Sequence, residues 1–170
     1  MIFVTVGTHE QPFDRLLQAV DRLKGSDIIQ EPVVIQTGYS HYQPKYSDYY
    51  KLLPYTKMQQ YIADARIVIT HGGPASFLMS LQMGKIPIVV PRQLAFKEHV
   101  NNHQVDFTKA VEERMGNIIP VYDIADLEDR IINYDKLVAG LSGKGSDSNN
   151  TIFNQRLNDM VDDLFNLQGK

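Results

Sequence analysis

The segment of this sequence that most constrains its fold runs from an apolar stretch through two glycines into a helix. Residues 67–69, Ile-Val-Ile, form a β-branched run typical of a buried parallel strand. They lead into residues 70–77, Thr-His-Gly-Gly-Pro-Ala-Ser-Phe, in which the proline suits the first position of a helix. A strand that turns into a helix in this way directs backbone N–H groups and the positive end of the helix dipole at one point. This geometry favours the binding of a phosphate or diphosphate.

Apolar runs alternate with amphipathic helical segments over most of the chain. The predicted strands are residues 2–6, 32–37, 67–70, 87–91 and 117–121. The predicted helices are a segment with its apolar face at 13–23, a short helix around 58–62, and residues 74–84, 98–114 and 126–134. Such alternation predicts an α/β fold with a single Rossmann-like, doubly wound parallel sheet. At 170 residues the chain is long enough for one domain with a proper core.

The composition changes near residue 139. Residues 139–150 are rich in glycine, serine and asparagine and predict a flexible linker between a domain at 1–138 and a final amphipathic helix at 151–170. The apolar stripe of that helix consists of Ile152, Phe153, Leu157, Met160, Val161, Leu164 and Phe165. We expect this helix to dock either on its own domain or on another chain. A tyrosine-rich stretch at 39–61, predicted as a long loop before the short helix, is open to two interpretations, surface packing or an interface.

The overall charge narrows the possible functions. A formal charge of −3 and a pI near 5.9 argue against a general nucleic-acid-binding protein. The absence of cysteine excludes a disulfide scaffold and a thiolate metal site, and it fits a reducing cytoplasm. The apolar run at residues 2–6 predicts a strand rather than a signal peptide or a membrane span. We therefore expect a cytoplasmic protein, unless a partner holds it at a membrane.

Polar residues stand where the predicted strands end. Thr8 and His9 follow the first strand, Gln36 lies near the end of the second, His71 follows the third, and Arg92 follows the fourth. Because ligands bind beyond the carboxyl ends of parallel strands, we expect these side chains to lie close together. All histidines of the chain fall in these loops or at the start of the helix after the fourth strand, and they are His9, His41, His71, His99 and His103.

Several common site patterns are not found in the sequence. There is no Gly-x-Gly-x-x-Gly after the first strand and no Gly-x-x-x-x-Gly-Lys-Ser/Thr, which argues against an NAD site and a P-loop. There is also no Asp-x-Asp, the metal-diphosphate clamp of one large class of sugar transferases. His99 and His103 have the i, i+4 spacing of zinc ligands on a helix, but no third ligand is evident. We therefore expect no metal.

Taken together, several motifs resemble the C-terminal, nucleotide-sugar-binding half of family 28 glycosyltransferases. The motifs are residues 36–38, 58–69, 71–76, 84–91, 98–99 and 102–104. Residues 4–13, Val-Thr-Val-Gly-Thr-His-Glu-Gln-Pro-Phe, are similar to the small catalytic subunits of bacterial capsular and exopolysaccharide synthesis. These in turn resemble the catalytic subunit of the eukaryotic two-subunit dolichol-linked GlcNAc transferase. The resemblance covers residues 1 to about 134 and implies the donor-binding half of a GT-B glycosyltransferase.

The resemblance also implies a UDP-sugar site that needs no metal or other cofactor. The residues that it places against the diphosphate are Thr8, His9, His71, Gly72, Gly73 and Ser76. The residues that it places against the sugar hydroxyls, or in support of them, are Glu98, His99 and Asn102. The rest of the donor site would include Gln36, and Tyr55 against the uracil. Where the family usually carries an acid that binds the ribose, this chain has Met79.

Inverting sugar transfer needs a base for the acceptor hydroxyl and electrostatic stabilisation of the leaving diphosphate. His71 and Arg92 are candidates for the second role in place of a metal, and His9 is the best candidate base within the chain. The resemblance implies a membrane-anchored partner subunit that brings a lipid-diphosphate-linked acceptor to the cytoplasmic membrane face, in capsular or exopolysaccharide synthesis. Two alternatives stay open: a non-catalytic nucleotide-binding or scaffolding subunit of such a complex, and an unrelated nucleotide-binding domain.

Overall fold

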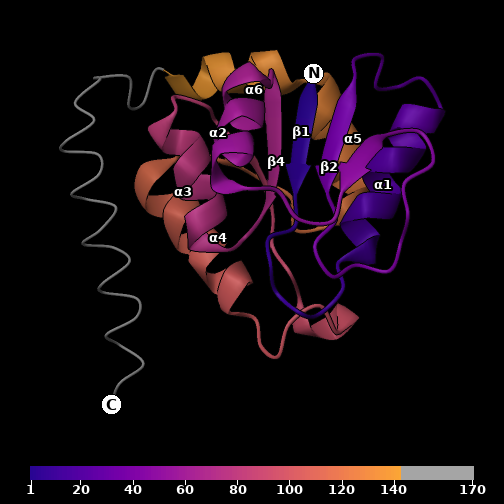
Figure 1. Cartoon of the computed structure of the whole chain (residues 1–170). Helices are drawn as coiled ribbons and strands as arrows, with labels where there is room; N and C mark the ends of the chain where they lie inside the picture. The colour runs from indigo at the N-terminus through magenta and orange to yellow at the C-terminus, as the bar shows by residue number, and fades with distance from the viewer. Residues whose placement is uncertain (143–170) are drawn as a thin grey trace.

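A parallel sheet of six strands forms the centre of the computed structural model, which describes residues 1–142 (Figure 1). The strands are β1 (Ile2–Thr5), β2 (Val33–Gln36), β3 (Asp48–Tyr50), β4 (Ile67–His71), β5 (Ile88–Val90) and β6 (Ile119–Pro120). They lie in the order β3-β2-β1-β4-β5-β6, and every neighbouring pair is parallel. In this doubly wound order the chain reverses direction across the sheet between β1 and β4. The predicted Rossmann-like α/β fold is therefore confirmed.

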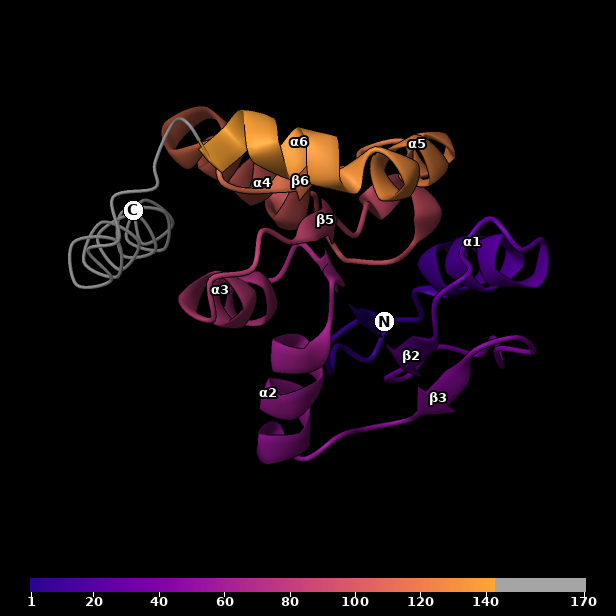
Figure 2. The same cartoon turned by 90° about the horizontal axis from the view of Figure 1, so that it is seen from above.

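Helices cover both faces of the sheet (Figure 2). The helices are α1 (Asp14–Gly25), α2 (Tyr55–Asp64), α3 (Pro74–Gln82), α4 (His103–Met115), α5 (Leu127–Ile132) and α6 (Tyr134–Ser142). Two short 3-10 helices are η1 (Leu94–Phe96) and η2 (Ile124–Asp126). One face of the sheet packs against α1, α5 and α6, and the other packs against α2, α3 and α4.

The alternation of side chains along each strand explains these two layers. Ile2 and Val4 of β1 join the apolar cluster of α1 and α5, whereas Phe3 between them joins the cluster beneath α2. All three side chains are fully buried. Because successive residues of a strand point to opposite faces, a continuous apolar run is what a strand covered on both sides requires.

The structure adds one strand that the sequence analysis placed in a loop. Residues 48–50 form β3 at the edge of the sheet, parallel to β2. All three side chains of β3 are exposed, so no apolar alternation marks the strand in the sequence. Its backbone hydrogen bonds with β2 define it, and the Thr37 N–H extends this pairing by donating to the Tyr50 carbonyl at 2.9 Å.

Two predicted boundaries were also wrong. The helix predicted at 98–114 begins at His103, so Glu98 and His99 lie in the connection before it and the zinc-like spacing on one helix face does not occur. Residues 139–142, predicted as the start of the linker, belong to α6. The rest of the predicted linker and the predicted docking helix at 151–170 lie outside the described residues. Within residues 1–142, no helix has the length and apolar character needed to cross a membrane.

Candidate functional site

The carboxyl ends of four adjacent strands carry buried polar side chains. Thr5 ends β1 and lies between Gln36 of β2 and Thr70 of β4 in the register of the sheet. His71 ends β4, and Arg92 follows the end of β5. These five side chains, which we call the polar floor, are between 0% and 8% exposed. They lie at the edge of a parallel sheet where ligands bind.

Four members of the polar floor have a buried side-chain atom that finds no hydrogen-bond partner among the described residues. These atoms are Gln36 Oε1, Thr70 Oγ1, His71 Nδ1 and Arg92 Nε. Buried polar atoms in folded proteins are nearly always paired, so an unpaired one marks a place that a ligand or water completes. Four such atoms at one edge of the sheet favour a binding site for a polar ligand.

The His71 ring is enclosed between two glycines. A Cβ added at Gly7 or at Gly73 would overlap the ring, and Gly7 has a φ of +72°, which favours glycine. Burial, followed by the positive charge of Arg92, lowers the pKa of His71 to about 3. The imidazole is therefore neutral at physiological pH, and it offers one N–H donor and one acceptor to the site.

His9 and His99 stack beside this group. Their ring centroids are 4.7 Å apart and their planes differ by 17°. His9 Nε2 lies 2.8 Å from Oε1 of Gln11. Burial and the neighbouring His9 lower the pKa of His99, and both rings act electrostatically on His71. Three of the five histidines singled out in the sequence thus converge, from the β1–α1 loop, from β4 and from the β5–α4 segment.

The other two histidines have different places. His41 is exposed and its Nδ1 lies 3.7 Å from Asp14 at the start of α1. His103 begins α4, and its charge contributes to the low pKa of His99. The central set of histidines is therefore separate from the exposed His41 ring, which lies between β2 and β3 and contacts the start of α1.

Arg92 is directed at the backbone rather than into the site. Its Nη1 donates to the carbonyls of Gln11 at 2.7 Å and Glu98 at 3.1 Å, and its Nη2 donates to the carbonyl of Val6 at 2.9 Å. Burial lowers the pKa of Arg92 to about 10, so it stays charged. The predicted direct contact of Arg92 with the diphosphate is not favoured by this geometry. Its positive field reaches the site, while its hydrogen bonds hold two loops together.

Glu98 also differs from its predicted role at the sugar hydroxyls. Its side chain is 4% exposed, and its carboxylate accepts two hydrogen bonds from Arg15, at 2.8 Å from Nε and 2.9 Å from Nη2. Arg15 was not predicted from the sequence. It lies 83 positions from Glu98, and no local pattern indicates such a pair. Only the path of the chain in space brings the two side chains together.

Gly72 and Gly73 form the turn that connects β4 to α3, and neighbouring atoms leave too little room for a Cβ at either position. A Cβ at Gly72 would lie 2.9 Å from Oγ1 of Thr108 on α4, and one at Gly73 would overlap His71. The Ser76 N–H donates to the Gly73 carbonyl at 3.1 Å in the first turn of α3. The turn therefore brings the start of a nine-residue helix close to His71. This supplies the dipole end expected for an anion.

The remaining predicted residues lie around this centre without a common contact. Thr8 is exposed in the loop after β1. Asn102 precedes α4, and its Oδ1 accepts a hydrogen bond from the Leu94 N–H at 3.0 Å. Tyr55 begins α2 and is 62% exposed. Met79, at the position expected to bind ribose, packs against the apolar cluster beneath α2.

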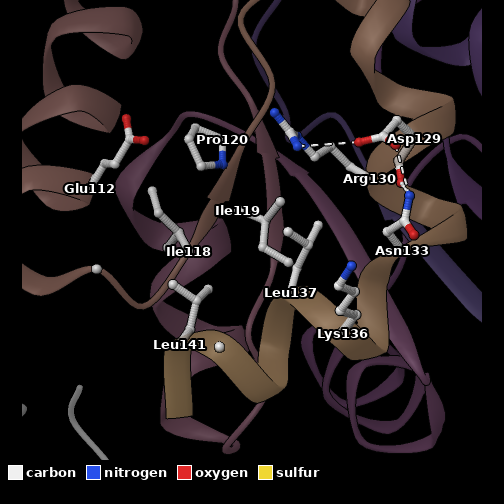
Figure 3. Close-up of a pocket in the computed structure, with 12 residues that line it drawn as sticks. Glu112, Ile118, Ile119, Pro120, Asp129, Arg130, Asn133, Lys136, Leu137 and Leu141 are labelled. Carbon is white, nitrogen blue, oxygen red and sulfur yellow. Dashed lines mark hydrogen bonds and ion pairs between the residues drawn. The ribbon is translucent and has the colours of Figure 1, made fainter. Parts of the chain in front are cut away.

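A separate groove of about 710 Å³ follows the edge strand β6, between α4 on one side and α5 and α6 on the other (Figure 3). Its apolar lining includes Ile118, Ile119, Leu137 and Leu141. None of the predicted site residues lines this groove. It is therefore distinct from the polar floor. Among residues 1–142, no three His, Asp or Glu side chains come together as a metal site would require.

The family and the two solved structures to which this chain is similar are described as glycosyltransferases. The profile of the family described as glycosyltransferase family 28 C-terminal domain matches residues 1–131. The fold is similar to the crystal structure of the glycotransferase of kitacinnamycin, with a TM-score of 0.60 and 17% identity over 84% of this chain and 37% of that chain. It is also similar to the glycosyltransferase SnogD from Streptomyces nogalater, with a TM-score of 0.57 and 15% identity over 83% of this chain and 36% of that one. A search of curated proteins finds no match.

Proposed function

Because the chain belongs to the family described as glycosyltransferase family 28 C-terminal domain, we propose that it binds a UDP-sugar over the polar floor. In this proposal it is the donor-binding, catalytic subunit of an inverting hexosyltransferase. One observation carries the proposal: His9 and His99 lie near His71, which contacts the glycine before α3, and the sheet edge there holds buried polar atoms that have no partner among the described residues. The neutral imidazole of His71, the helix dipole and the field of Arg92 together suit a diphosphate.

The leaving diphosphate is stabilised by groups that are already in place. N–H groups at the start of α3 and the His71 imidazole donate hydrogen bonds to its oxygens, and the charge of Arg92 lies behind them. Such preorganised donors act without reorganisation as negative charge develops in the transition state. No metal is required for this role.

His9 is the proposed general base. Gln11 Oε1 is an amide oxygen and only accepts, so His9 Nε2 carries the proton and Nδ1 keeps the lone pair. The acceptor hydroxyl oxygen attacks the anomeric carbon while the bond from that carbon to the diphosphate oxygen breaks. The hydroxyl proton passes to Nδ1 of His9, and UDP leaves with the bonding electrons.

We further propose a partner that supplies the acceptor. The chain spans 37% and 36% of the two similar glycosyltransferases, which therefore contain further protein outside the matched region. Large exposed apolar side chains stand in segments that follow strand ends, namely Tyr39, Leu52, Tyr55, Leu94, Phe96 and Val100. Such side chains suit a protein interface. The proposed partner is membrane-anchored and presents a lipid-diphosphate-linked saccharide of capsular or exopolysaccharide synthesis at the cytoplasmic face of the membrane.

A second function, a non-catalytic nucleotide-binding subunit of the same complex, is favoured by two residues. Met79 packs into an apolar cluster and offers the ribose no carboxylate. Glu98 is already paired with Arg15 and offers none to the sugar. With the partner subunit present, His9→Gln separates the two functions. Loss of sugar transfer at unchanged UDP affinity supports catalysis by this chain, and unchanged transfer supports the non-catalytic subunit.

Binding of UDP is tested by calorimetry on the chain, alone and with the partner. We expect UDP to bind and ADP to bind more weakly, and His71→Asn to weaken UDP binding by about tenfold, the size of a lost hydrogen bond to a charged group. His41→Gln is the matched control, because His41 is exposed beside Asp14 at the start of α1. The proposal is wrong if UDP does not bind under either condition. Stronger binding of ADP than of UDP would indicate an unrelated nucleotide-binding domain.

A further inference from the structure

Two loops that carry the stacked histidines are connected by a buried ion pair. Arg15 lies in the first turn of α1, directly after the loop that holds His9, and Glu98 is adjacent to His99. The two side chains are only 13% and 4% exposed. Their two hydrogen bonds, at 2.8 Å and 2.9 Å, form the bidentate contact that a guanidinium makes with a carboxylate.

The ion pair is also fixed by its surroundings. The Arg15 guanidinium lies 5.4 Å from the ring centroid of Phe13 and 4.5 Å from that of Phe96. Glu98 Oε2 accepts a further hydrogen bond from the Gln93 N–H at 3.1 Å. The two rings and the backbone donor restrict the positions of both side chains. The pair therefore orients the β5–α4 segment relative to α1.

We propose that Arg15 and Glu98 are positioning residues that hold the His99 ring against the His9 ring. Each member of the pair lies next to the segment that carries one of the rings, so the geometry of the pair determines the separation of the rings. In this position Glu98 does not touch the sugar. Glu98 affects UDP binding through the histidines, and this part of the proposal rests on the proposed function. The effect of Glu98 on the stacking of His9 and His99 is independent of that function.

Arg92 strengthens the same connection by a different route. It donates to the Glu98 carbonyl on one loop and to the Gln11 carbonyl on the other. The two loops are thus joined once by the ion pair of two side chains and once by the Arg92 side chain, which binds backbone carbonyls of both. We expect that loss of the Arg15–Glu98 pair alone leaves the loops attached through Arg92, while the His9 and His99 rings no longer stack. This makes the proposal testable in a folded protein.

The test is NMR of the histidine rings in Glu98→Gln and Arg15→Lys. In the parent chain we expect a ring-to-ring Overhauser effect between His9 and His99. Glu98→Gln should abolish it and move the titration of His99 upward, toward that of an ordinary histidine. Arg15→Lys keeps the charge but cannot span both carboxylate oxygens, so it should weaken the effect as well. UDP affinity should fall by about tenfold in Glu98→Gln, the size of one lost hydrogen bond to a charged group.

Glu31→Gln is the matched control. Glu31 pairs with Arg66 and with the N-terminal amino group, beside the amino ends of the strands, so its loss makes the same change of charge far from the histidines. This variant should keep the ring contact, the titration of His99 and the UDP affinity. The proposal is overturned if Glu98→Gln keeps the ring contact and the parental titration. If the ring contact is lost but the parent does not bind UDP, the positioning role stands and the proposed function fails.

Discussion

The surroundings of His71 tolerate little change, because its ring fills the space beside Gly73. A Cβ at Gly73 would overlap the ring, although the φ of Gly73, −76°, suits any residue. We expect Gly73→Ala to displace the ring, to lower the free energy of unfolding by ~1–3 kcal/mol and to weaken UDP binding. Gly140→Ala in α6 is the control, since among residues 1–142 no atom outside the adjoining helix backbone lies within 4 Å of its added Cβ. Urea unfolding and calorimetry measure both variants, and an unchanged UDP affinity in Gly73→Ala would contradict the assignment.

The low pKa of His71 makes stability depend on pH. Burial and the charge of Arg92 keep the folded ring neutral down to a pKa of about 3, whereas the unfolded ring binds a proton near 6.5. Between these values the unfolded state binds more protons, so stability is lost as the pH falls from 6.5 toward 3. We expect the contribution of this site to differ by about 2 kcal/mol between pH 7 and pH 5. His71→Asn does not titrate, so its urea unfolding should depend less on pH. An equal dependence in both proteins would exclude this role.

At the scale of elements, Arg92 connects the loops after β1 and β5. Its guanidinium spans the carbonyls of Val6, Gln11 and Glu98, and a lysine ammonium cannot reach all of them from one point. We expect Arg92→Lys to lower the free energy of unfolding by ~2–4 kcal/mol, because buried carbonyls lose their donors. Arg66→Lys, at an exposed ion pair, should cost less than ~1 kcal/mol. Urea unfolding of the two variants checks this, and equal losses would show that Arg92 is not the stronger connection.

Elements with an apolar pattern could be predicted from the sequence, and elements set by distant contacts could not. The buried strands and α1 follow from local periodicity. The three side chains of β3 are exposed, and the strand is defined by its backbone pairing with β2. The sequence of residues 48–50 therefore contains no local pattern that predicts a strand. The segment at 98–102 is compatible with a helix, but Glu98 is held by Arg15, 83 positions away, and α4 begins later.

The candidate site also combines features that could be predicted from the sequence with features that could not. His9, His71 and His99 could be expected at one edge, because the carboxyl ends of parallel strands meet there. The stacking of His9 on His99 depends on the paths of two loops, which the sequence does not specify. For the same reason Arg92 was expected to face a ligand and instead donates to three loop carbonyls. Position along the chain predicts which side chains meet, but not which of them is left free.

At the scale of the whole molecule, titratable and charged groups from separate elements meet at the site. We therefore expect ligand binding to be coupled to proton uptake. The groups that face His99 are His9 from the β1–α1 loop, His71 from β4, Arg92 after β5, and His103 at the start of α4. None of these neighbours is acidic, and the carboxylate of Glu98, which precedes His99 in the chain, is paired with Arg15. A diphosphate would bring negative charge to a place that otherwise disfavours a protonated imidazole.

The expected consequence is that a UDP-sugar binds more tightly as the pH falls. Burial and His9 lower the pKa of His99 in the free protein, and a bound diphosphate raises it. The complex then holds more protons than the free protein, so affinity increases toward low pH by up to about tenfold per pH unit for each proton taken up. A UDP-sugar is the ligand to use, because its diphosphate diester keeps a constant charge in this range. Calorimetry between pH 6 and 8 in buffers of different ionisation enthalpy counts the protons. His99→Gln should flatten the dependence and His41→Gln should keep it, whereas an affinity independent of pH in the parent chain would exclude proton uptake by the histidine pair.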